Sequence, residues 1–137
     1  MSQYAANLGS LAAEVKAGGG TPILVTPLTR CSFSGKPPKV TENLAKERAA
    51  TIEEAQKTDT LYIDLNKAST DYVNKIGTEA ADKYNLKEGD RTHLNPHGGV
   101  VFARIVADLL SSKYPQLANS IKPDDAMTAL ISAGKPA

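Results

Sequence analysis

The sequence contains no tryptophan, and aromatic residues make up only 5% of its 137 residues. Aromatic platforms on which nucleotide bases could stack are therefore scarce. The chain also has no large excess of charge of either sign. It contains 16 basic and 15 acidic residues, and its net charge is +1 with both histidines neutral. This balance excludes the basic surface of a typical nucleic-acid-binding protein and the polybasic segment that attaches proteins to anionic membranes. We expect neither a nucleic acid nor a membrane as partner.

Cysteine is limited to Cys31. A single cysteine excludes an intramolecular disulfide and a zinc site built from several cysteines. We expect Cys31 to be a small, partly buried residue. No apolar run approaches the ~20 residues that a membrane-spanning helix needs. Residues 1–4 (MSQY) do not have the pattern that begins a signal peptide. The sequence therefore leaves the localisation unknown.

The rest of the composition is that of a folded domain. Hydrophobic residues make up 41% and charged residues 23% of the chain, and its length suits one domain or a piece of a larger one. Apolar residues spaced i, i+3, i+4 and i+7 predict a first helix, which the glycines at 18–20 end. This expected apolar stripe consists of Leu8, Leu11, Ala12 and Val15.

Two short apolar runs have the character of β-strands. Residues 21–27 (TPILVTP) lack polar alternation, which predicts a parallel strand buried on both faces. Residues 61–65 (LYIDL) predict a second strand. Between them, residues 29–40 are rich in serine, glycine and proline, which predicts a long loop.

Two helices are expected in the middle of the chain. Thr41 is the predicted N-terminal cap of a helix over residues 41–57, and Asn66 is the predicted cap of a helix that extends to about Lys83. The inward face of the second of these helices is expected to include Tyr72, Val73 and Ile76.

A last long helix is marked by Asn95 at the cap position and Pro96 at the first helical position. Its apolar residues predict that it extends to about Lys113. Residues 115–137 are only weakly amphipathic, and we expect them to form a weakly structured tail.

Buried strands that alternate with helices predict an α/β fold with a parallel sheet covered on both faces. About two strands are present, whereas sheets typically have ~4–6. The pattern is therefore that of the C-terminal half of an α/β domain. The unpaired edge of the first strand offers a surface for pairing with another chain, so a homo-oligomer is possible.

Both histidines lie close together in the polar segment that precedes the last long helix. Asp90 and His93 are three residues apart, a distance at which the carboxylate can accept a hydrogen bond from the imidazole Nδ1–H. That bond would leave Nε2 free to act as a general base for a nucleophile. Two alternatives stay open: a solvated polar loop, and a metal site formed by Asp90, His93 and His97.

Three sequence runs together resemble the SGNH (GDSL-type) hydrolase family. Residues 90–98 (DRTHLNPHG), followed by an apolar helix, resemble its last conserved block, an Asp-x-x-His motif. Residues 18–30 (GGGTPILVTPLTR) are similar to the fourth strand region of its rhamnogalacturonan acetylesterase branch, and residues 62–66 (YIDLN) are similar to the fifth strand of that branch. The resemblance covers nearly the whole chain, from about residue 4 to residue 113.

The resemblance implies a flavodoxin-like three-layer α/β/α fold, with the whole chain as a partial SGNH hydrolase domain. The implied activity is hydrolysis of esters, typically the removal of acetyl groups from cell-wall polysaccharide, without a metal or an organic cofactor. By position, His93 would be the general base and Asp90 its orienting partner. The family is often secreted.

The sequence lacks the first conserved motifs of the family. The family's nucleophile is the serine of a Gly-Asp-Ser motif, whereas the only Gly-Asp pair here, Gly89-Asp90, is followed by Arg91. The Gly-x-Asn-Asp block, which supplies an oxyanion-hole residue, is also missing. Nothing in the sequence places the other candidate nucleophiles beside His93, namely Ser32, Ser34, Ser69 and Cys31. We expect this chain alone to be inactive; the alternative function is a non-catalytic, self-associating module.

Overall fold

Two short parallel strands form the central sheet. The computed structural model describes residues 2–137, and in it β1 (Ile23–Val25) pairs with β4 (Leu61–Ile63). The register places Ile23 opposite Leu61 and Val25 opposite Ile63. The predicted pair of parallel strands is confirmed, although the second strand ends two residues earlier than expected, at Ile63.

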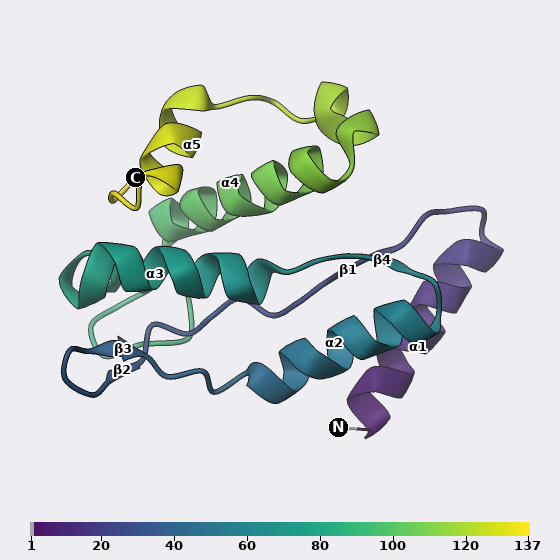
Figure 1. Cartoon of the computed structure of the whole chain (residues 1–137), viewed down its shortest axis with the longest axis horizontal. Helices are drawn as coiled ribbons and strands as arrows, with labels where there is room; N and C mark the ends of the chain where they lie inside the picture. The colour runs from purple at the N-terminus through teal and green to yellow at the C-terminus, as the bar shows by residue number, and fades with distance from the viewer. Residues whose placement is uncertain (1) are drawn as a thin grey trace.

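Helices cover both faces of this sheet (Figure 1). α1 and α2 pack against each other and against β1, while α4 packs against β4 from the opposite side and also contacts α3 and α5. This is a three-layer α/β/α arrangement of the flavodoxin-like class, as predicted. The helices are α1 (Ser2–Ala17), α2 (Ala45–Lys57), α3 (Leu65–Asp82), α4 (Pro96–Lys113), the 3-10 helix η1 (Pro115–Ser120) and α5 (Asp125–Ser132).

The first strand and the first helix are less buried than predicted. In β1, Leu24 is buried but Val25 is 43% exposed, so the expectation of burial on both faces is wrong for this position. Of the predicted stripe on α1, Ala12 is buried, whereas Leu11 and Val15 are exposed. The described elements leave the side chains of Val25, Leu11 and Val15 without full cover.

The predicted loop 29–40 contains a small antiparallel hairpin. β2 (Phe33–Ser34) pairs with β3 (Lys39–Val40), and a turn at residues 35–38 joins them. Gly35 has a φ of +83°, a backbone conformation that glycine adopts without a steric penalty. The prediction missed the hairpin because its strands have only two residues each.

The predicted caps of α2 and α3 are wrong. Thr41 extends the hairpin instead of starting α2: its N–H donates to the Ser32 carbonyl oxygen at 2.7 Å. In α3 the cap is Asp64, whose Oδ1 accepts from the Lys67 N–H at 3.2 Å, and Asn66 lies inside the helix. A carboxylate and an amide two residues apart are both good caps, so the sequence alone did not distinguish them.

The start of α4 is as predicted. Asn95 is its N-cap, with Oδ1 accepting from the Gly98 N–H at 2.8 Å, and Pro96 is the first helical residue. The helix ends at Lys113, also as predicted.

The core lies between α3 and α4. The predicted inward residues Tyr72 and Val73 are buried there, and Ile76 is partly buried against the same cluster. Residues 115–137, expected to be weakly structured, form η1 and α5, and α5 packs against α4. No helix within residues 2–137 combines the length and the apolar character needed to cross a membrane.

Candidate functional site

Asp90 and His93 are in direct contact in the loop between α3 and α4. The distance between Asp90 Oδ2 and His93 Nδ1 is 3.0 Å. The second carboxylate oxygen, Oδ1, accepts hydrogen bonds from the Thr92 and His93 N–H groups, each at 2.9 Å. The carboxylate is thus fixed by its own loop while it holds the imidazole through Nδ1.

The loop geometry follows from several backbone interactions. Gly89 has a φ of +76°, and the Asp90 N–H donates to the Lys87 carbonyl oxygen at 3.1 Å, so the chain turns just before the carboxylate. After the turn, the Leu86 N–H donates to the His93 carbonyl oxygen at 2.9 Å. These bonds close the loop at its base and fix the backbone on both sides of Asp90.

The loop is also attached to the segment that leads into the hairpin. The Cys31 N–H donates to the Arg91 carbonyl oxygen at 3.1 Å. Arg91 also forms an ion pair with Asp82 at the end of α3. These contacts fix the loop that carries Asp90 and His93 against two other parts of the fold.

Asp90 remains ionised over the whole physiological range. Hydrogen bonds from the His93 and Thr92 backbone N–H groups, and then the His93 side chain, lower the pKa of Asp90 to about 2. An ionised partner at Nδ1 favours the tautomer that carries its proton there, which leaves Nε2 as an acceptor. The His93 side chain is 70% exposed, and within residues 2–137 Nε2 has no hydrogen-bond partner.

Within residues 2–137, His93 forms no hydrogen bond with any of the candidate nucleophiles Ser32, Ser34, Ser69 and Cys31. The buried Ser69 hydroxyl donates to the Leu65 carbonyl oxygen at 2.7 Å and accepts from the Thr29 N–H. Ser34 bonds to the Thr41 hydroxyl. Burial raises the pKa of the Cys31 thiol, an effect that Arg91 only partly offsets, so its reactive thiolate form is disfavoured.

In the structure, Asp90, His93 and His97 do not come together as a metal site. His97 turns away from Asp90 and His93: its Nε2 lies 2.9 Å from the Ala137 carbonyl oxygen, and its ring packs on Tyr84. No group of three or more potential metal ligands gathers in the described part of the chain.

A second polar cluster, which the sequence analysis missed, lies where β1 and β4 end. Asp64 accepts hydrogen bonds from Arg48 Nε at 2.9 Å and from the Thr26 hydroxyl at 3.0 Å. Burial acts to raise the pKa of Asp64, but the bonds from Arg48, from the Lys67 N–H and from Thr26 bring it below its usual value. A polar residue directly after each strand was the available signal, because functional groups of parallel sheets gather at the carboxyl ends of strands.

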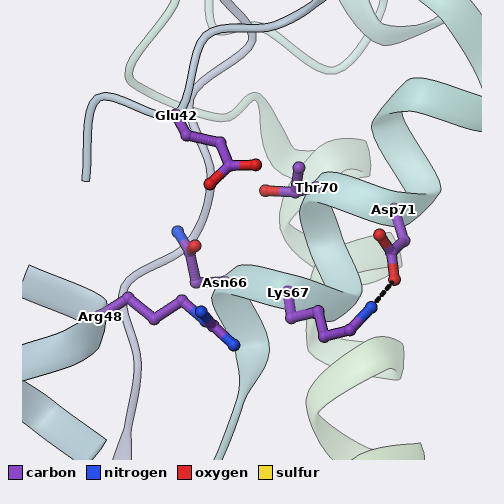
Figure 2. Close-up of a pocket in the computed structure, with 6 residues that line it drawn as sticks. All are labelled: Glu42, Arg48, Asn66, Lys67, Thr70 and Asp71. Carbon is purple, nitrogen blue, oxygen red and sulfur yellow. Dashed lines mark hydrogen bonds and ion pairs between the residues drawn. The ribbon is translucent and has the colours of Figure 1, made fainter. Parts of the chain in front are cut away.

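Beside this cluster is a cavity of about 230 Å³, between the residues that precede and begin α2 and the first turns of α3 (Figure 2). Its lining is polar and carries charges of both signs. The lining residues are Glu42, Arg48, Asn66, Lys67, Thr70 and Asp71.

Comparison with known proteins adds one structural relative. The YxiM protein of Bacillus subtilis has a crystal structure that matches this chain with a TM-score of 0.69 and 29% sequence identity. The match covers 77% of this chain but only 30% of that one, so this chain is similar to a part of the larger protein. No protein-family model and no curated protein matches the sequence. The similarity to YxiM supports the flavodoxin-like α/β fold.

Proposed function

We propose that this chain is the C-terminal part of an SGNH-type ester hydrolase resembling rhamnogalacturonan acetylesterases, with acetylated polysaccharide as its substrate class. The observation that carries the proposal is the 3.0 Å contact between Asp90 Oδ2 and His93 Nδ1. It lies in the Asp-x-x-His run from which the resemblance was drawn. The proposal assigns His93 as general base and Asp90 as its orienting partner.

The geometry suits this division of roles. With Nδ1–H donating to Asp90, His93 Nε2 can accept a proton from a hydroxyl as that hydroxyl attacks an ester carbonyl. The imidazolium that forms is stabilised by the adjacent carboxylate, which stays ionised because its pKa is about 2. The same proton is then donated to the leaving alcohol. The proposed mechanism requires neither a metal nor an organic cofactor.

The nucleophile and the oxyanion hole must come from outside residues 2–137. Within them, no serine hydroxyl and no thiol forms a hydrogen bond with His93. A triad acts as a unit, so loss of its nucleophile costs about as much rate as loss of all three members. Each missing oxyanion donor would cost a further factor of about 10²–10³. The chain alone is therefore proposed to be inactive by this mechanism.

A chimeric enzyme tests the proposal. This chain replaces the C-terminal part of an active SGNH hydrolase that keeps its own Gly-Asp-Ser and Gly-x-Asn-Asp blocks, and turnover of p-nitrophenyl acetate is measured. We expect the chimera to be active and His93→Ala to reduce kcat by at least about 10³-fold. His97→Ala is the matched control, because the other histidine contacts Ala137 and Tyr84, and it should keep kcat within a few-fold. A folded chimera without turnover, or equal losses in both variants, would contradict the proposal.

A second candidate function is supported by the exposed apolar surface around β1. Within the described residues, β1 pairs with β4 alone, so its other edge carries unpaired backbone groups. Val25 is 43% exposed at that strand, and Leu11 and Val15 of α1 are 59% and 45% exposed. An apolar surface beside a free strand edge favours pairing with a second copy of the chain. The alternative proposal is a self-associating module without catalytic activity.

A further inference from the structure

The cavity beside α3 contains a buried hydroxyl group without a partner. Thr70 is 7% exposed, yet its Oγ1 has no hydrogen-bond partner within the described residues. Figure 2 shows this hydroxyl extending across the cavity toward Glu42. Buried polar groups in folded proteins are nearly always hydrogen-bonded, so this hydroxyl requires a partner from the cavity, either a water molecule or a ligand.

Two other buried hydroxyl groups on the helices donate to the carbonyl oxygen four residues earlier in the same helix. Ser69, the neighbour of Thr70 in α3, donates to the Leu65 carbonyl oxygen at 2.7 Å. In α2, Thr51 donates to the carbonyl oxygen of Glu47 at 2.8 Å. Thr70 is in a regular part of α3 and forms no such bond. Its hydroxyl is therefore available to the cavity.

The cavity is not suited to an anion. Its two cationic groups already pair with carboxylates, since Arg48 donates to Asp64 through Nε, at 2.9 and 3.1 Å, and through Nη2, and Lys67 pairs with Asp71 at 2.6 Å. The first N–H groups of α3 are also occupied, because the N–H of Asn66 donates to Thr26 and that of Lys67 donates to Asp64. A phosphate or carboxylate would meet cations that already pair with carboxylates, and it would lie beside the acidic Glu42 side chain.

Two of the lining residues, Asn66 and Glu42, offer open acceptor oxygens. The Asn66 side chain donates to the Pro27 carbonyl oxygen at 3.0 Å, which leaves its own Oδ1 free. The Glu42 carboxylate has no hydrogen bond or ion pair in the described structure, and Figure 2 shows it on the opposite wall from Thr70. The formal charges of the six lining residues, two acidic and two basic, sum to zero. The complementary ligand is uncharged, donates to two acceptors and accepts from one hydroxyl.

We infer that this cavity binds a small neutral molecule with neighbouring hydroxyl groups, such as a monosaccharide or a polyol. Two ligand hydroxyls donate to Glu42 and to Asn66 Oδ1, and a ligand oxygen accepts from the Thr70 hydroxyl. The volume of about 230 Å³ suits a single sugar ring rather than an oligosaccharide. None of the lining residues belongs to the Asp90–His93 loop, so this inference and the proposed esterase function can fail independently.

The test is an NMR titration of the ¹⁵N-labelled chain with glucose, galactose, mannose and xylitol, each in turn. We expect at least one of them to cause saturable shifts in the backbone amides of residues 66–71, with a Kd of about 1–10 mM. Inorganic phosphate is the anionic probe and should cause no saturable shift there. Absence of saturation with all four polyols up to about 100 mM would overturn the inference, as would tighter binding of phosphate.

Three variants test the assigned contacts. Thr70→Val keeps the shape but removes the hydroxyl, and should weaken the polyol about tenfold. Thr58→Val is the matched control, because its hydroxyl already donates to Glu54 away from the cavity, and should leave Kd unchanged. Glu42→Gln retains an acceptor oxygen and should weaken a neutral ligand only a few-fold. Unchanged binding in Thr70→Val, with its spectrum showing an intact fold, would overturn the inference.

Discussion

At the scale of single residues, Asp90 determines which nitrogen of His93 is available. Its two carboxylate oxygens have different tasks, since Oδ1 accepts two backbone N–H groups and Oδ2 contacts the imidazole. Both contacts use an acceptor oxygen of the carboxylate. An asparagine side chain has one acceptor oxygen and one donor nitrogen, so it can keep one of these contacts but not both.

Asp90→Asn should therefore reverse the tautomer of His93. The asparagine Oδ1 can keep the backbone hydrogen bonds, but its Nδ2 is a donor and would oppose Nδ1–H. We expect the neutral ring of the variant to carry its proton on Nε2, whereas the wild-type ring carries it on Nδ1. Imidazole ¹⁵N chemical shifts distinguish the two forms. The same tautomer in both proteins would show that Asp90 does not orient the ring.

The pH dependence of this loop follows from the lowered pKa of Asp90. Because its folded-state pKa of about 2 lies below the ordinary value of 3.8, the contribution of Asp90 to stability is present above about pH 4 and is lost as pH falls toward 2. NMR titration of the Asp90 carboxyl carbon should give a midpoint near pH 2. A midpoint near 4 for Asp90 would contradict the hydrogen bonds assigned to it.

At the scale of elements, the start of α4 positions the Asp90–His93 loop against α3. Gly98 lies in the first turn of this helix, and a Cβ atom there would come within 2.6 Å of the Tyr84 carbonyl oxygen. That oxygen also accepts from the Asn95 N–H at 2.9 Å. The contact is between backbones, so no side-chain rotation can relieve it.

We therefore expect Gly98→Ala to lower the free energy of unfolding by about 1–3 kcal/mol, the usual range for overpacking. Gly99→Ala is the matched control in the same helical turn, because no atom beyond its own helical turn and its chain neighbours lies within 4 Å of its added Cβ. Alanine is the better helix former, so this control should raise stability by up to about 1 kcal/mol. Urea unfolding measures both changes. Equal effects at the two positions would contradict the close packing of α4 on Tyr84.

The elements also show what the sequence could and could not predict. Asn95 and Pro96 stand directly before an apolar pattern, and their local signal was sufficient to place the start of α4. The cap of α2 was misplaced because Thr41 bonds to Ser32 across the hairpin, a contact between residues nine apart. The Asp90–His93 contact was predictable because both residues lie in one short loop. The cavity beside Thr70 was not, because segments distant in sequence form it.

At the scale of the whole molecule, the sheet is small for the number of helices that surround it. Two strands of three residues each support an α/β/α arrangement, and an apolar surface stays open around Val25. We expect this surface to associate with a second copy when nothing else covers it.

Light scattering after size exclusion tests this expectation. The mass should rise above the 14.5 kDa of the monomer as concentration increases, and Val25→Lys should restore the monomer because edge lysines oppose strand pairing. Val100→Lys changes a valine on α4 that is 57% exposed, and it should leave association unchanged. A wild-type monomer at all concentrations would refute self-association through β1.

We propose that His93 is a general base whose nucleophile is not among the described residues. The direct measurement combines a p-nitrophenyl acetate assay of the purified chain with mass spectrometry after exposure to a fluorophosphonate, which labels activated serines. We expect no burst, no turnover beyond that of free imidazole at the same concentration, and no labelled serine. A burst that His93→Ala abolishes, together with a fluorophosphonate adduct on a serine of this chain, would contradict it.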